Sequence, residues 1–333
     1  MSGSATPAAS PSRTADPYLL ARYLGRRPVA PQWFDDALAQ RPERTDFLSK
    51  GARIELLRWG DAGKPGLLFL PGNGAHADWW SPIAPFFAQH FHCAALSWSG
   101  MGRSDRRPEG YLIATLAQEA RDAIEAANLH RGGPVIVVGH SLGGFLGLHA
   151  AADSPHIGGL IVIDSPIAMS RERSRAMHAD APKSHPAHRP FASVAEGLAR
   201  FRLSPPQACG NDYFVDHIAR LSLVAQDEGL VWHFDPRRVS LANSGAPVLD
   251  RIACPLAFLY GDRSAMIDGD TLARTIAALP PGTPVVPIRD AAHHVPLDQP
   301  LALVAALRAL LASWPRSGRD GQGWLSEGPG DAR

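Results

Sequence analysis

The sequence of 333 residues has almost no net charge, few cysteines and no long hydrophobic run. Lysine and arginine together number 33 and aspartate and glutamate 32, so the formal net charge is +1. A nucleic-acid binder or a protein that docks on acidic membranes normally shows a clustered basic excess, so this balance argues against both classes. A neutral or apolar small molecule suits such a chain better than a phosphorylated one.

The three cysteines, Cys93, Cys209 and Cys254, are odd in number and far apart. They favour neither a disulfide framework nor a zinc knuckle, and they suit a reducing compartment. No stretch approaches the roughly 18 uninterrupted apolar residues of a transmembrane helix, and the Ser/Ala/Pro-rich start lacks the apolar core of a secretory signal. The sequence therefore predicts a cytoplasmic protein that does not bind membranes.

The length and the 45% hydrophobic content allow a sizeable core, in one large domain or two small ones. Residues 1–14 and 315–333 are rich in Gly, Ser, Pro and charge, so we expect both to be disordered tails. Residues 15–44 are interpreted as an N-terminal extension.

Short apolar runs alternate with helical patterns between the two tails. These runs are continuous, as in strands that are covered on both faces. The predicted strands are Arg53–Trp59, Gly66–Leu70, His92–Ser97, Pro134–Val138, Gly159–Ile163, Pro255–Tyr260 and Pro284–Ile288. The predicted helices are Leu116–Ala127, Leu142–Asp153, Thr271–Leu279 and Leu301–Ser313. This order predicts an α/β fold with a mostly parallel, doubly wound sheet.

One segment, Pro166 to about Ala246, interrupts the alternation. It contains no convincing buried strand, but helical patterns occur around Val194–Phe201 and Tyr213–Ala225. Because it lies between two predicted strands of the sheet, we interpret residues 166–246 as a helical cap. The core then comprises residues 45–165 and 247–314.

The segment Gly139-His-Ser-Leu-Gly143 lies between a predicted strand and a predicted helix. This context is typical of the Gly-x-Ser-x-Gly nucleophile elbow. Ser141 must sit on a strained turn with its Oγ exposed, so the neighbours two residues away on each side must lack bulk. Gly139 and Gly143 meet that demand, and Gly144 relieves the crowding further. Ser141 is therefore the predicted nucleophile.

A serine hydroxyl is a weak nucleophile, so it needs a positioned base, which in turn needs an orienting acid. The segment Ala291-Ala-His-His-Val-Pro-Leu-Asp-Gln-Pro300 follows the last predicted strand. Together with the serine motif, it resembles the α/β-hydrolase superfamily, and the resemblance covers about Thr45–Trp314. The terminal motif of that family has a histidine seven residues before the proline that opens the last helix. The resemblance therefore implies His293 as the base, and we expect His294 either to pack in the core or to contact the catalytic residues from behind.

The resemblance also implies an oxyanion hole. The segment Leu68–His76 resembles the loop after the third strand, which usually reads His-Gly-x, although Pro71 replaces the histidine here. By alignment, the donors are the backbone N–H groups of Asn73 and Leu142, and such donors stabilise the developing oxyanion. The segment Ser97–Asp105 resembles the Gly-x-Gly-x-Ser loop after the fourth strand, and we interpret it as a structural loop.

Of the three predicted catalytic residues, the acid is the one whose position the sequence defines least. Family enzymes most often carry it in a Gly-x-x-Asp pattern after the strand Leu256–Tyr260, but here Ser264 occupies that position. A serine cannot stabilise an imidazolium as a carboxylate does. The alternatives are Asp164, at the end of a predicted strand where other members of the superfamily carry the acid, Asp262 and Asp268. Asp164 is the acid assigned to the predicted triad.

Two other groups have weaker signals. His185 and His188 have the spacing of metal ligands, but no third ligand accompanies them, so we expect a solvated loop of the cap. The aromatic pair Trp79-Trp80 either lines an acyl pocket or packs in the core.

The resemblance and the motifs predict a serine hydrolase that acts on a carboxylic ester or a similar acyl compound. We expect a neutral or apolar acyl substrate, with no metal or organic cofactor and no nucleic-acid partner. The alternatives are hydrolysis of a carbon–carbon bond in a diketone and a non-catalytic ligand-binding protein on the same fold.

Overall fold

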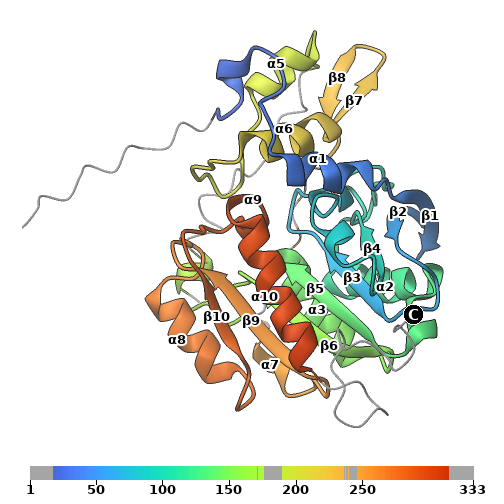
Figure 1. Cartoon of the computed structure of the whole chain (residues 1–333), viewed down its shortest axis with the longest axis vertical. Coiled ribbons are helices and arrows are strands. Elements are labelled where there is room, and N and C mark those ends of the chain that lie inside the picture. The colour runs from blue at the N-terminus through green and yellow to red at the C-terminus, as the bar shows by residue number, and fades with distance from the viewer. Residues whose placement is uncertain are drawn as a thin grey trace, which may run out of the picture.

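A computed structural model describes residues 18–170, 172–175, 190–235, 237, 239 and 246–314 (Figure 1). The two predicted tails, together with His185 and His188, lie outside the described residues. None of the helices in the described ranges is long and apolar enough to cross a membrane.

An eight-stranded sheet in the order β1-β2-β4-β3-β5-β6-β9-β10 forms the centre of the fold (Figure 1). Its strands are β1 (Glu43–Ser49), β2 (Ala52–Trp59), β3 (Gly66–Leu70), β4 (His92–Leu96), β5 (Val135–His140), β6 (Ile157–Ile163), β9 (Leu256–Gly261) and β10 (Val285–Ile288). The strands from β4 across to β10 pair in parallel, whereas β1 and β2 are antiparallel to their neighbours. The predicted fold class, a mostly parallel α/β sheet, is confirmed.

The continuous apolar runs have a simple structural cause, because both faces of the sheet are covered. In β3, Leu67 and Phe69 belong to one hydrophobic cluster, and Leu68 and Leu70 belong to another on the opposite face. Successive side chains of a strand point to opposite faces, so a strand buried on both sides has no polar position.

Helices cover the two faces of the sheet. The α-helices flanking it are α1 (Gln32–Ala39), α2 (Ile113–Ala126), α3 (Leu142–Ala152), α7 (Ala246–Leu249), α8 (Gly269–Ala278), α9 (Val295–Asp298) and α10 (Pro300–Ser313). The 3₁₀ helices are η1 (Ala21–Tyr23), η2 (Ala77–Trp79), η3 (Ala84–Phe86) and η4 (Leu129–Gly132). Side chains of α2, α3 and α8 pack in or against the cluster on one face, and those of α1 and α10 belong to the cluster on the other.

The edge strand β1 was not predicted from the sequence. Its residues alternate in exposure, and Leu48 is an exposed large hydrophobic residue, so the strand has no continuous apolar run. The turn Lys50-Gly51 joins it to β2, with φ values of 46° and 81° at the two residues. Positive φ at both central residues is the geometry of a tight hairpin turn whose twist matches that of the strands.

The chain between β6 and β9 contains α5 (Val194–Ala199), α6 (Asp212–Leu221) and a hairpin of β7 (Leu223–Gln226) and β8 (Gly229–Trp232). These elements lie together beyond one end of the sheet, at the top of Figure 1. The helix expected over Tyr213–Ala225 is wrong after Leu221, because the apolar residues that follow pair with β8.

Candidate active site

Ser141 occupies a strained turn between β5 and α3. Its backbone has φ 53° and ψ −118°, and its N–H donates to the carbonyl of Ile163 at 2.8 Å. A non-glycine residue at positive φ costs free energy and persists where the surrounding structure enforces it, commonly at functional sites. Ser141 is half-buried, and it lies at the carboxyl end of the sheet, where ligands of open α/β sheets bind.

The glycines around Ser141 are required by backbone that packs against backbone. A Cβ on Gly143 would lie 2.3 Å from the carbonyl oxygen of Leu70, and a Cβ on Gly139 would lie 2.4 Å from the carbonyl oxygen of Gly143. A Cβ on Gly144 would lie 2.2 Å from Oγ of Ser165. The elbow therefore depends on three residues without side chains.

Replacing Gly143 with alanine is expected to lower the free energy of unfolding by about 1–3 kcal/mol, because the backbone of Leu70 cannot move away without disturbing β3. Gly269→Ala is the matched control, since a Cβ there meets nothing within 4 Å. Urea unfolding of both variants measures the difference. Equal stability of the two variants would contradict the packing described here.

His293 and Asp164 form a buried hydrogen-bonded pair. Nδ1 of His293 donates to Oδ1 of Asp164 at 2.7 Å, and the Asp164 side chain is fully buried. The carboxylate also accepts from Oγ of Ser264 at 2.6 Å and from the N–H of Gly261 at 2.8 Å. The hydrogen bond to the Asp164 carboxylate holds the proton of His293 on Nδ1 and so fixes the tautomer of the ring.

The other two candidate acids have different partners. The carboxylate of Asp268 accepts from the N–H of Thr271, capping α8, and pairs with Arg173. Asp262 forms an ion pair with Arg289 at 3.4 Å. Of the three aspartates, the structure brings Asp164 to His293, and Ser264, at the usual place of the acid, donates a hydrogen bond to it.

The ends of two paired strands carry Ser141 and Asp164 to the same edge of the sheet. Ser141 follows β5 and Asp164 follows β6, its paired neighbour. His293 lies in the loop after β10, and Nε2 of His140 donates to its carbonyl oxygen at 2.8 Å. The residue that precedes Ser141 thus anchors the backbone of His293.

The two predicted oxyanion donors flank Ser141. A Cβ on Gly72 would lie 3.4 Å from Cβ of Ser141, so the loop that carries Asn73 runs beside the serine. Leu142 is the first residue of α3, where backbone N–H groups have no partner within the helix. Within the described ranges, neither the N–H of Asn73 nor that of Leu142 donates a hydrogen bond.

Two further buried histidines lie against His293. The ring centroids of His140 and His294 lie 5.0 and 4.9 Å from that of His293. Burial lowers the pKa of His140 to about 3 and that of His294 well below its usual value. The motifs predict a packing or supporting role for His294 and no role for His140, because the partners of a side chain depend on loops that the motifs do not describe.

Both tryptophans of the aromatic pair are buried in the same hydrophobic core cluster. Trp80 is 1% exposed and packs on Phe69 in the core, whereas the ring of Trp79 lies 5.6 Å from that of His294.

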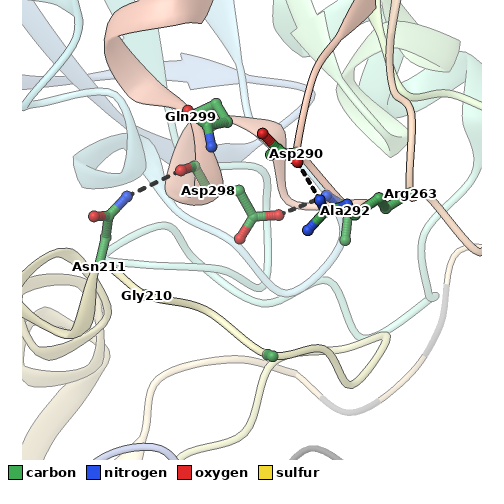
Figure 2. A pocket seen from close by; sticks show the side chains of 8 residues that line it. Gly210, Asn211, Arg263, Asp290, Ala292, Asp298 and Gln299 are labelled. Carbon is green, nitrogen blue, oxygen red and sulfur yellow. Dashed lines mark hydrogen bonds and ion pairs between the residues drawn. The ribbon is translucent and has the colours of Figure 1, made fainter. Parts of the chain in front are cut away.

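A hollow of about 460 Å³ lies beside the His293 loop (Figure 2). Asp298 lines it and accepts from the N–H of Ala292, while Asn211 donates to the carbonyl oxygen of Asp298. Neither Ser141 nor His293 lines the hollow, so we assign it no substrate. Burial raises the pKa of Asp298 to about 6, and its hydrogen bond from Ala292 partly opposes this.

The raised pKa of Asp298 predicts a pH-dependent stability. Between its ordinary pKa of 3.8 and about 6, the folded chain holds a proton that the unfolded chain has lost, so stability falls as pH rises through this window. Asp298→Asn does not titrate. We expect its free energy of unfolding to rise relative to wild type by about 2 kcal/mol from pH 4 to pH 7. A difference that stays constant across this range would contradict the assignment.

Comparisons with known proteins agree on the fold. Residues 67–307 match a family model described as the alpha/beta hydrolase family. A putative carbamate hydrolase RutD of Cronobacter sakazakii is 28% identical over 119 residues, which are 35% of this chain and 43% of that protein. A protein of the same description from Enterobacter cloacae is 32% identical over 94 residues, 28% of this chain and 34% of the relative. The chain thus matches less than half the length of these curated relatives.

Solved structures match over a longer stretch. The structure of E-2-(acetamidomethylene)succinate hydrolase has a TM-score of 0.70 and 21% identity, covering 81% of this chain and 98% of that one. A thioesterase domain from the curacin biosynthetic pathway has a TM-score of 0.65 and 24% identity, with the same coverage. At these identities the similarity is one of fold.

Proposed function

Because the chain belongs to the alpha/beta hydrolase family, we propose that it is a serine hydrolase that cleaves a carboxylic ester through an acyl-enzyme intermediate. The observation that carries the proposal is the hydrogen bond from Nδ1 of His293 to the fully buried Asp164, beside the strained turn of Ser141. That bond leaves Nε2 of His293 unprotonated. A neutral imidazole in this tautomer accepts the proton of a serine hydroxyl.

In the first half of the reaction, Oγ of Ser141 attacks the ester carbonyl carbon while Nε2 of His293 takes the hydroxyl proton. The negative charge of Asp164 stabilises the imidazolium that forms. The carbonyl oxygen becomes an oxyanion, which accepts hydrogen bonds from the N–H groups of Asn73 and Leu142. When the tetrahedral intermediate collapses, the proton on His293 passes to the departing alcohol, and the acyl group remains on Ser141.

In the second half, Nε2 of His293 takes a proton from a water molecule that attacks the acyl carbon. A second oxyanion forms in the same place, and its collapse breaks the bond to Oγ of Ser141. The proton on His293 then returns to Ser141, and the carboxylic acid leaves. Each step uses His293 in one tautomer, which Asp164 maintains.

Residues 166–246 are the proposed cap, and residues 45–165 and 247–314 the proposed hydrolase core. The ring of Trp232 packs on those of Phe191 and Phe201, with centroids 5.4 and 5.5 Å apart. This aromatic group and Trp79 beside His294 support a neutral or apolar acyl substrate. The three free cysteines support a cytoplasmic location.

A series of p-nitrophenyl esters of increasing acyl length tests the function. We expect the purified full chain to release p-nitrophenolate with saturation kinetics, with kcat/KM highest for an apolar acyl chain. The Ser141→Ala variant supplies the blank rate. If no ester is cleaved faster than this blank, the proposal fails.

A carbamate is the second candidate substrate, because the matched curated relatives carry the name carbamate hydrolase. The same steps cleave a carbamate, with an amine or an alcohol as the leaving group. A p-nitrophenyl carbamate assayed beside the esters separates the two candidate substrates. If the natural substrate is a carbamate, we expect kcat/KM to be higher for the carbamate than for the esters.

A further inference from the structure

Three buried histidines converge where β5 ends and the loop after β10 begins. His140, His293 and His294 are 2%, 3% and 4% exposed, and their ring centroids lie 4.9–5.9 Å apart. Each ring offers one nitrogen atom, and these three nitrogens lie within 4.8 Å of one another. They converge although the proposed reaction uses only one imidazole as a base.

Hydrogen bonds assign the tautomer of each ring. Nε2 of His140 faces the carbonyl oxygen of His293 at 2.8 Å, and Nδ1 of His293 faces the carboxylate of Asp164 at 2.7 Å. Nε2 of His294 faces the carbonyl oxygen of Pro205 at 3.2 Å. These oxygens can only accept, so each facing nitrogen carries the proton. The lone pairs therefore lie on Nδ1 of His140, Nε2 of His293 and Nδ1 of His294.

One of the unprotonated nitrogens is buried without a hydrogen-bond partner in the described ranges, and another lies beside the serine. Nδ1 of His294 is buried and has no hydrogen-bond partner within the described ranges. Nδ1 of His140 lies beside the serine, because one Cβ built on Gly72 would lie 3.2 Å from it and 3.4 Å from Cβ of Ser141. Burying a nitrogen lone pair without a hydrogen-bond donor costs free energy, because the lone pair accepts a hydrogen bond from water in the unfolded chain. A metal ion that coordinates the lone pair would recover part of that cost.

We propose that His140, His293 and His294 bind a single Zn²⁺ ion that inhibits the enzyme. Imidazole nitrogen is a preferred ligand of zinc, and three histidines with one open position form a common zinc site. Ligating histidines almost always donate their second N–H to a carboxylate or a backbone carbonyl, as all three do here. Asp164, which accepts a hydrogen bond from His293, also places a negative charge next to the proposed site, and this charge favours binding of a cation.

The spacing is within reach of a tetrahedral site. A Zn–N distance of about 2.1 Å in tetrahedral geometry places two ligand nitrogens about 3.4 Å apart. One nitrogen of each ring lies within 4.8 Å of the others, and the proposal requires ring rotations that bring the three lone pairs to the shorter spacing.

Inhibition follows from the lone pair that the ion occupies. Nε2 of His293 cannot take the proton of Ser141 while it is bound to zinc. This consequence rests on the proposed function, whereas the metal site itself rests on the geometry of the three imidazoles.

Calorimetric titration of the full chain with Zn²⁺ tests the site directly. We expect one ion per chain for the wild type, and an affinity at least about 10-fold lower for His294→Asn, which lacks one ligand. The matched control is His156→Asn. His156 and His130 lie beside Glu125 on the surface, with ring centroids 5.0 Å apart, so this variant removes the obvious competing site. Wild-type affinity in the control is expected.

Equal affinity in His294→Asn and wild type, or loss of binding in His156→Asn, would overturn the proposal. The visible spectrum of the wild type with Co²⁺ gives a second measurement that needs no variant. The intense absorption of four-coordinate Co²⁺ supports the buried site, and the weak absorption of six-coordinate Co²⁺ contradicts it. Circular dichroism shows whether His294→Asn is folded.

Measuring ester hydrolysis in the presence of Zn²⁺ separates the proposed function from the proposed metal site. We expect Zn²⁺ to inhibit the wild type and His156→Asn equally, and EDTA to restore the rate. If no ester is cleaved at all, the proposed function fails while calorimetry still decides the metal site. If esters are cleaved and Zn²⁺ binds without inhibition, the assignment of the ion to His293 fails.

Discussion

Replacing Ser141 with alanine is expected to lower kcat for p-nitrophenyl ester hydrolysis by about 10⁶-fold, the size of the loss when a serine protease loses its nucleophile. The reason is chemical, since no other hydroxyl occupies the elbow and alanine offers no atom that can form the acyl bond. Alanine also fits the space of serine, so the fold is retained. Steady-state kinetics and circular dichroism of the purified variant measure both effects.

Ser154→Ala is the matched control, because Ser154 lies just beyond the other end of α3, where its Oγ accepts from the N–H of His156. Its kcat is expected to stay within about twofold of wild type, since surface substitutions far from a site rarely matter. A folded Ser141→Ala variant that retains a tenth of the wild-type kcat would contradict the role of Ser141.

Asp164→Asn is expected to lower kcat by about 10⁴-fold, as the corresponding change does in serine proteases. Asparagine keeps the shape but removes the charge, so His293 loses the partner that holds its proton on Nδ1. The backbone of Asp164 has φ 49°, a conformation that asparagine tolerates well. The loss therefore reports on the chemistry of the carboxylate, and kcat against pH is the measurement.

Asp262→Asn and Asp268→Asn are the controls, because these aspartates pair with Arg289 and Arg173 away from His293. Both variants are expected to keep kcat within about threefold of wild type. Near-normal kcat in Asp164→Asn, with a large loss in either control, would move the acid to the other aspartate.

The buried strands could be predicted from the sequence because the sheet is covered on both faces. In β3 and β5 every side chain is buried, so burial leaves a continuous apolar run. β1 could not be predicted, since its exposed residues interrupt any apolar run and its position depends on the turn at Lys50. The end of α6 was also missed, because the short apolar run at Leu223–Gln226 is compatible with either a helix or a strand.

The candidate site divides in the same way. Ser141 follows from local sterics, because its neighbours must be glycines whichever side chains surround them. The sequence left three aspartates as candidates for the acid, because which carboxylate reaches His293 depends on the register of β6 with β9. Asp164 lies at the end of β6, where Ser264 and Gly261, at the end of β9, donate to it. Those two hydrogen bonds join segments far apart in the sequence, so no local sequence pattern predicts them. The same is true of the hydrogen bond from His140 to His293.

Fluorophosphonate labelling is the sharpest test of Ser141 as the covalent nucleophile. The serine Oγ bonds to phosphorus, fluoride leaves, and His293 takes the proton. We expect one adduct per chain, located by peptide mass spectrometry on Ser141, with labelling slowed in Asp164→Asn and absent in Ser141→Ala. An adduct on another residue, or no adduct on the folded wild-type chain, would contradict it.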